Sequence, residues 1–177
     1  MKPEIISTET IYKGRVFDLQ TSVVRENEIE YTREIIKHNG SAVIVPVFED
    51  LSVALVRQYR HAAEKYLLEI PAGTLEIGES PEEGAAREIE EEIGFKAGKI
   101  EKLTEFYVSP GFLTEKMFVF LATDFTETAQ NLDEDEAISI EKYSFPELFD
   151  KIRNGEIQDA KSMVSLILAG VKFGFLY

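Results

Sequence analysis

The pattern of apolar and polar residues along the chain predicts a mixed α/β protein. Strands are expected where the two kinds of residue alternate over a short stretch bounded by turn residues. This criterion places strands at residues 4–12, 16–24, 29–37, 42–48, 53–58, 66–70, 100–107, 117–124 and 137–144. The fourth and fifth resemble a hairpin closed at Glu49-Asp50, and Pro46 within the fourth predicts an edge strand or a bulge.

Residues 80–94 carry the signals of a complete helix. Ser80 is a typical N-cap, Pro81 fits the first helical position, and Glu83 completes a capping box. Gly94 suits the left-handed conformation that often ends a helix. Apolar residues that recur every four positions form the stripe expected to be buried: Ala85, Ile89 and Ile93.

Two more helices are expected late in the chain, at residues 146–154 and from about 159 to 172. Asp159 is the expected N-cap of the second helix. The apolar stripe of that helix is predicted to consist of Met163, Leu166, Ile167 and Gly170.

The central helix concentrates acidic residues on one face. Glu88, Glu91 and Glu92 are three and four positions apart, so their carboxylates project from the same side. Like charges at this spacing cost about 0.2–0.5 kcal/mol per pair on an isolated helix. One interpretation is a solvated acidic face. The other is a set of oxygen ligands for Mg²⁺ or Mn²⁺, which favour carboxylates, water and phosphate oxygens.

The residues around this helix favour the metal interpretation. Residues 73–95 consist of one Gly, five residues, a Glu, seven residues and then Arg-Glu-Ile-x-Glu-Glu-x-Gly-Phe. Even for a Glu-rich chain, chance produces this order roughly once in a hundred million starting positions. The segment resembles the signature box of the Nudix hydrolases, which cleave nucleoside diphosphates linked to another moiety. The resemblance implies a metal held by the Ala72 carbonyl, Glu88, Glu91 and Glu92, with Arg87 orienting the glutamates.

Composition narrows the classes of function. A net charge of −14 and a pI near 4.6 argue against binding nucleic acid through its phosphates. An acidic enzyme that acts on an anionic phosphate ester needs a metal to offset the repulsion. The chain has no Cys, and its only two His residues argue against a histidine-based zinc site. The absence of Cys favours a cytoplasmic location. No signal peptide is visible and no apolar stretch could span a bilayer, so we expect no membrane partner.

The resemblance implies the Nudix fold for residues 39–177, an α/β architecture with a mixed β-sheet sandwiched between α-helices. Residues 1–38 precede it as a three-stranded antiparallel extension. Three strands of this length seldom bury enough apolar surface alone, so they must pack on the main domain or on a partner subunit. In similar Nudix proteins this segment swaps onto the partner, which predicts a homodimer.

Segments flanking the box resemble the ADP-ribose pyrophosphatase branch of the family. They are VRQYRHAAEKYLLEIPAG, YVSPGFLTE, LDEDEAISIE and GEIQDAKSMVSLIL. The resemblance implies that the small-molecule substrate is contacted by Arg57, Arg60, Glu69, Pro110, Gly111, Arg33 and Glu34. Arg60 is favoured as a contact to the diphosphate, because guanidinium offers a planar fork for phosphate oxygens.

The other substrate contacts have alternative interpretations. Glu69 is either a polar contact to substrate or a structural hydrogen bond. The turn that contains Pro110 and Gly111 either walls the ribose pocket or is a plain β-turn. Arg33 and Glu34 either meet the adenine end of the substrate, across a dimer, or form an ordinary charged pair on a strand.

A catalytic Glu is expected on the acidic loop at residues 133–136. Consecutive acids are ordinarily a solvated loop, but the resembled proteins carry a catalytic Glu at this place. Alignment favours Glu136, and Glu134 is the alternative because the acidic run allows a slip of two residues. The expected reaction is metal-assisted attack of water on ADP-ribose, giving AMP and ribose 5-phosphate, with Glu136 or a box glutamate such as Glu91 taking the proton.

Three other functions remain open. A pyrophosphatase for another nucleotide sugar such as GDP-mannose would share this architecture. A non-catalytic ADP-ribose sensor on the same fold belongs to a different class, and such proteins typically lose box glutamates, which are all present here. A nucleoside triphosphatase is less favoured, because those enzymes are usually short chains without the N-terminal strands.

Overall fold

The structure is a computed structural model that describes residues 2–132 and 136–176. Three helices lie in this part of the chain: α1 (Pro81–Ile93), α2 (Phe145–Arg153) and α3 (Ala160–Lys172). The strands, in chain order, are β1 (Glu4–Lys13), β2 (Asp18–Glu26), β3 (Ile29–Lys37), β4 (Ser41–Pro46), β5 (Ser52–Arg60), β6 (Lys65–Glu69), β7 (Ala72–Thr74), β8 (Phe95–Tyr107), β9 (Lys116–Glu127) and β10 (Ile138–Ser144). A single turn of 3₁₀ helix, His61–Ala63, joins β5 to β6. No helix in the described residues is long and apolar enough to cross a membrane.

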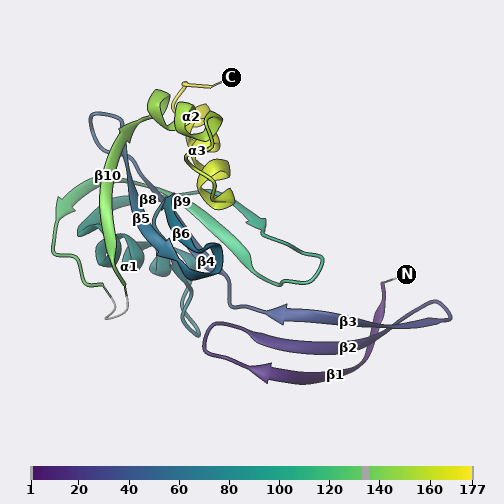
Figure 1. The fold of residues 1–177 in the computed structure, drawn as a ribbon. Helices are drawn as coiled ribbons and strands as arrows, with labels where there is room; N and C mark the ends of the chain where they lie inside the picture. Colours follow the sequence, from purple (N-terminus) through teal and green to yellow (C-terminus); the bar gives the residue numbers. More distant parts are fainter. Residues whose placement is uncertain (1, 133–135, 177) are drawn as a thin grey trace.

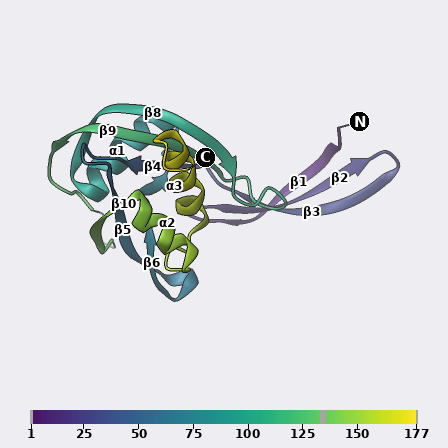
Figure 2. The same cartoon turned by 90° about the horizontal axis from the view of Figure 1, so that it is seen from above.

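The first three strands form the expected antiparallel sheet, in the order β1-β2-β3. This sheet extends away from the rest of the molecule, as Figures 1 and 2 show from two directions. Its last strand is tied to the main body by backbone bonds. The Ile36 amide donates to the Phe112 carbonyl at 2.7 Å, and the Thr114 amide donates to the Ile36 carbonyl at 2.9 Å. The orientation of the sheet is therefore set mainly at β3.

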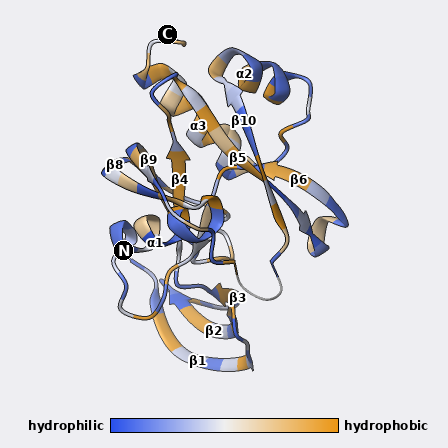
Figure 3. Ribbon diagram, turned by 90° about the vertical axis from the view of Figure 1, so that its left-hand side faces the viewer, coloured by the Kyte–Doolittle hydropathy of each residue, from blue (hydrophilic) through white to orange (hydrophobic). Residues whose placement is uncertain are grey.

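The body is organised around β4, which is buried along its whole length and appears as an orange arrow in Figure 3. It lies in a four-stranded mixed sheet of order β7-β4-β9-β8, where it pairs in parallel with β9. Because side chains alternate along a strand, Ile44 packs on the side of α1 while Val45 packs on the side of α2 and α3. Helices thus cover both faces, which confirms the predicted sandwich.

The predicted hairpin between residues 42–48 and 53–58 is wrong. A tight turn does connect the two strands, with the Phe48 amide donating to the Ser52 carbonyl at 2.9 Å and one bridge between Val47 and Val53. Beyond that bridge they diverge: β4 joins the four-stranded sheet, and β5 is the centre of a separate sheet of order β10-β5-β6. Pro46 ends β4 beyond the stretch paired with β7, so its missing N–H breaks no bond on that side.

Helix α1 has the predicted ends. The Ser80 side chain accepts from the Glu83 amide, Glu83 completes the capping box, and Gly94 adopts φ +70° at the C-cap. The predicted stripe is buried as well: Ala85, Ile89 and Ile93.

Helix α3 begins at the predicted N-cap, where the Asp159 carboxylate accepts from the Ser162 amide at 2.9 Å. Its predicted apolar stripe is partly wrong. Leu166 is fully buried but Ile167 is 42% exposed, and the buried face runs instead through small residues at positions 162, 165 and 169. Ser162 is buried where the helix packs on the core, and its Oγ accepts a hydrogen bond from the Ile70 amide at 2.8 Å.

Candidate active site

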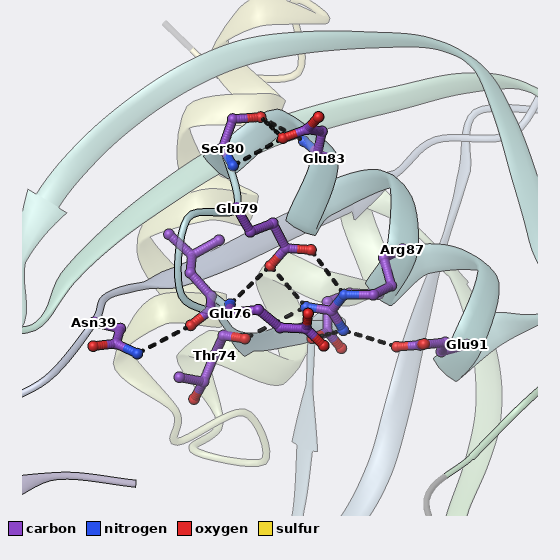
Figure 4. Close-up of polar contacts among 10 residues, drawn as sticks. Asn39, Thr74, Glu76, Glu79, Ser80, Glu83, Arg87 and Glu91 are labelled. Carbon is purple, nitrogen blue, oxygen red and sulfur yellow. Dashed lines mark hydrogen bonds and ion pairs between the residues drawn. The ribbon is translucent and has the colours of Figure 1, made fainter.

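Arg87 organises the acidic face of α1. Its Nη1 donates to Glu88 at 2.7 Å. Figure 4 shows two more of its bonds, from Nη1 to Glu91 at 2.8 Å and from Nε to Glu79 at 2.9 Å. A longer bond of 3.4 Å joins Nη2 to the Thr74 carbonyl. One guanidinium therefore offsets the repulsion among the helix carboxylates and links the helix to the strand and loop that precede it. This geometry agrees with the orienting role expected for Arg87.

Two of the three carboxylates among the predicted metal ligands are buried. Glu88 is 8% exposed and Glu92 is 3% exposed, whereas Glu91 is half-buried. Burial raises the pKa of Glu88 to about 7, outweighing the charge of Arg87. Burial, together with the negative charges of Glu88 and Glu136, raises the pKa of Glu92 to about 8. Buried carboxylates of this kind are costly to ionise unless a cation compensates them.

The strand β7 makes room for one of these carboxylates. A Cβ built on Gly73 would lie 1.8 Å from Oε1 of Glu88, so only glycine leaves space for this carboxylate against the strand. Next to it, the Ala72 amide donates to Glu92 at 3.1 Å. The Ala72 carbonyl, the predicted further ligand, thus belongs to the residue whose N–H already fixes Glu92.

The donor set suits a hard cation such as Mg²⁺, because it consists of carboxylate oxygens gathered beside a strand that carries a backbone carbonyl. In residues 2–132 and 136–176 no three Asp, Glu or His side chains form a ready metal cage. Arg87 bonds Glu88 and Glu91, and the Ala72 amide bonds Glu92, so these carboxylates are arranged by the protein itself.

Two cavities open beside this acidic face. One, of about 350 Å³, is lined by Glu88, Glu91 and Glu136, together with Arg15, Val16, Gly73, Thr74, Glu76, Arg87 and Asn131. The other, of about 370 Å³, is lined by Arg60 and Glu136 with Arg15, Gln58, Tyr59, His61 and Ala137. Glu136 thus lines both cavities, one with the box glutamates and the other with Arg60, and its catalytic role stays a prediction. The alternative, Glu134, is outside the described residues.

Arg60 is held in place by a buried carboxylate. Glu69 is 1% exposed and accepts from Nε and Nη2 of Arg60 at 2.9 and 2.8 Å. It also accepts from Lys161 of α3, whose ammonium lies 2.9 Å from Asp159. Burial pushes the pKa of Glu69 upward, but the bonds and charges of Arg60 and Lys161 bring it below its ordinary value. Glu69 was expected to be either a contact to substrate or a structural hydrogen-bonding group, and the bonds to Arg60 and Lys161 are those of the second kind.

Lys161 was not identified from the sequence. A signal for it exists, since a Lys two positions after an N-cap Asp, at the start of an apolar helix, must find a buried partner or leave the helix face. The partner, Glu69, is 92 residues away in the chain, and nothing in the local pattern indicates it.

A third cavity, of about 440 Å³, is lined by the predicted pair Arg33 and Glu34, with Leu19, Thr32, Ile36 and Phe112. The guanidinium of Arg33 lies 4.1 Å from the centre of the Tyr31 ring. From the turn that contains Pro110 and Gly111, it is the exposed ring of Phe112 that lines this cavity. Pro110 and Gly111 themselves line none of the three cavities.

Arg57 is not brought to the site. Its Nε donates to Glu141 of β10 at 2.5 Å and its Nη2 to the same carboxylate at 3.3 Å. It lines none of the three cavities described above. Its neighbour on β5, Gln58, does line a cavity. Because successive side chains of a strand point to opposite faces, Arg57 points away from that cavity.

Comparison with known proteins agrees with this architecture. The model of the NUDIX domain family matches residues 38–165, and the chain belongs to this family as a Nudix hydrolase. It is 37% identical to an ADP-ribose pyrophosphatase of Bacillus subtilis, over 94% of this chain and 91% of that protein. It is also 37% identical to a methanol dehydrogenase activator of Bacillus methanolicus, over 91% of this chain and 89% of that protein.

Two further similar proteins are named for other activities. A GDP-mannose pyrophosphatase of an Enterobacter strain is 33% identical, over 88% of this chain and 92% of that protein. A crystal structure of an ADP compounds hydrolase superposes with a TM-score of 0.88 at 26% identity, covering 99% of this chain and 96% of that chain. The likeness therefore includes the N-terminal sheet as well as the box.

Proposed function

We propose that this Nudix hydrolase is a Mg²⁺-dependent pyrophosphatase that cleaves the diphosphate of ADP-ribose into AMP and ribose 5-phosphate. The observation that carries the proposal is the position of Glu136 between the box glutamates and Arg60, where a diphosphate would meet carboxylates on one side and a guanidinium on the other. The relatives that share most of their length with this chain include an ADP-ribose pyrophosphatase, which favours this nucleotide sugar.

Glu88, Glu91, Glu92 and the Ala72 carbonyl would hold the metal. The two buried carboxylates have raised pKa values in the protein alone, and a divalent cation is the partner that would keep them ionised. When bound, Mg²⁺ offsets the charge of the diphosphate and makes water at the site more acidic. Mn²⁺ has the same preference for oxygen ligands and would substitute for it.

The side chains of the protein divide the remaining tasks. Arg60 binds the diphosphate, with its plane fixed by the paired bonds to Glu69. Glu136, which lines both cavities, takes the proton of the water that attacks the reacting phosphorus, and this requires hydrogen-bond contact between its carboxylate and that water. Arg33 and Glu34 bind the adenine end in the third cavity, where the exposed ring of Phe112 offers a face for stacking.

The test is turnover of a panel that contains ADP-ribose, GDP-mannose and other ADP-linked compounds, with and without Mg²⁺ and with products identified. We expect ADP-ribose to be hydrolysed with the highest kcat/KM, and Glu92→Gln to reduce that turnover by orders of magnitude while the fold survives. The GDP-mannose pyrophosphatase relative makes GDP-mannose the second candidate substrate. Wild-type rates in Glu92→Gln at low Mg²⁺ would show that the box glutamates do not hold the metal.

The assembly we propose is a homodimer formed through the N-terminal sheet. Several large apolar side chains of this sheet are exposed, with fractions of 42–67%: Ile5, Ile11, Val16, Phe17 and Ile29. A second copy of the chain would cover them. Sedimentation at micromolar concentration should give the mass of two chains, and a stable, active monomer would contradict the proposal.

A further inference from the structure

The β1–β2 turn of the N-terminal sheet reaches the active site of its own chain. Figure 1 shows the turn at the end of the sheet that lies nearest to α1. Arg15, at this turn, lines both the cavity beside the box glutamates and the cavity that contains Arg60. Among residues 2–132 and 136–176, Glu136 is the only other one that lines both of these cavities. The guanidinium of Arg15 and the carboxylate of Glu136 therefore both lie where the two cavities adjoin.

The local sequence fixes how the turn presents this side chain. The Gly14 amide donates to the Phe17 carbonyl at 3.1 Å and to the Asp18 carboxylate at 3.3 Å, which closes the turn tightly. A Cβ on Gly14 would lie 2.8 Å from the backbone carbonyl oxygen of Phe17, so the close approach depends on glycine. Arg15 follows directly and is exposed at the tip.

The charges around the junction call for another cation when substrate is bound. The cavity beside the box is lined by four carboxylates, those of Glu76, Glu88, Glu91 and Glu136. A diphosphate placed between Arg60 and the box would pass Arg15, whose planar fork suits bidentate contact with phosphate oxygens.

We propose that Arg15 binds the diphosphate of the substrate held in the active site of its own chain, so that the N-terminal sheet supplies a substrate contact in cis. This inference rests on the proposed pyrophosphatase function. It makes Arg15 a determinant of affinity for any diphosphate-linked substrate, whatever group lies beyond the diphosphate.

The test compares Arg15→Ala with Arg25→Ala, using the full-length enzyme and ADP-ribose. Arg25 is a matched control, because it is also an exposed Arg of this sheet, paired across from Glu4 at the end opposite the β1–β2 turn, and it bonds Glu30. Loss of a charge-assisted contact predicts a fall in kcat/KM of about 10–100-fold for Arg15→Ala, mainly through KM, with a change in Tm no greater than that of Arg25→Ala. We expect Arg25→Ala to remain within twofold of the wild type.

Wild-type kinetics for Arg15→Ala would overturn the assignment, and so would equal losses in both variants, which would reflect only the charge of the sheet. An inactive wild type would instead refute the proposed function, so the two failures are distinguishable. Co-expression of Arg15→Ala with Glu92→Gln tests the arrangement in cis. If Arg15 serves its own chain, mixed dimers contain no intact site and activity stays low, whereas purified mixed dimers that recover toward half of the wild-type activity would overturn the cis arrangement.

Discussion

Gly73→Ala isolates the space that the box reserves for one carboxylate. The backbone at this position is not in the left-handed region, so alanine is permitted there on conformational grounds. The three nearest atoms to the added Cβ all belong to Glu88: Oε1 at 1.8 Å, Cδ at 2.0 Å and Oε2 at 2.4 Å. The substitution therefore expels the Glu88 carboxylate and is not expected to disturb the strand.

We expect Gly73→Ala to have a small effect on the free energy of unfolding and a large effect on kcat/KM. Moving Glu88 breaks its 2.7 Å bond from Arg87, worth about 1.5–3 kcal/mol for a charged pair. It also relieves the burial that raises the pKa of Glu88 to about 7, and these two effects oppose each other. We expect the free energy of unfolding to change by less than about 2 kcal/mol. Displacing a metal ligand should lower kcat/KM by at least about 10–100-fold, as loss of the groups that hold ligands does.

The assay is a cycle of four proteins: wild type, Gly73→Ala, Glu88→Ala and the double variant. Kinetics with ADP-ribose over a range of Mg²⁺ concentrations would be combined with urea unfolding. In the Glu88→Ala background the added methyl meets no carboxylate, so Gly73→Ala should have no further effect on either quantity. The reasoning is refuted if Gly73→Ala keeps wild-type activity, or if it costs the same stability in both backgrounds.

Two further variants probe the residues behind and between the cavities. Glu69→Gln should destabilise the protein by about 1.5–3 kcal/mol at pH 7, because it removes the charge that Arg60 pairs with and leaves Lys161 with Asp159 alone. The folded pKa of Glu69 is below its ordinary 4.5, so its contribution to the free energy of unfolding is complete above pH 4.5 and is lost as the pH falls through the folded pKa. The difference in stability between wild type and Glu69→Gln, measured by urea unfolding, should therefore disappear in acid. A difference independent of pH would argue against the pairing. Glu136→Gln should lower kcat by about 10²–10⁴-fold with little change in KM; if it is silent and Glu134→Gln is damaging, the catalytic role belongs to Glu134.

Local signals were sufficient for the helices and for most strands. The ends of α1 follow from Ser80, Glu83 and Gly94, whose side chains or backbone act on residues at most four positions away. The divergence of β4 and β5 could not be predicted in this way. Both strands are apolar and joined by a tight turn, and only the partners recruited from later in the chain, β9 and β10, draw them into different sheets.

The same distinction separates the site residues that were predicted from those that were not. Spacing along one helix was enough to group Glu88, Glu91 and Glu92 on one face. The direction of an Arg side chain on β5 depends on the carboxylate that it pairs with, and this partner is distant in the sequence. Arg57 pairs with Glu141, outside the cavities. The buried group that positions Arg60 lies nine residues further on in β6, and the Lys that completes this network comes from α3.

The spacing of the box can now be explained position by position. Gly73 leaves the volume that the Glu88 carboxylate occupies. Glu79, at the end of the loop, binds Nε and Nη2 of Arg87 and so aims Nη1 at Glu88 and Glu91. The like charges that would oppose helix formation in isolation are thereby joined through one guanidinium, and the carboxylates are held before any metal arrives. A shift of either Glu79 or Arg87 by one residue would turn the guanidinium away from the acidic face, which is why the motif specifies both positions together.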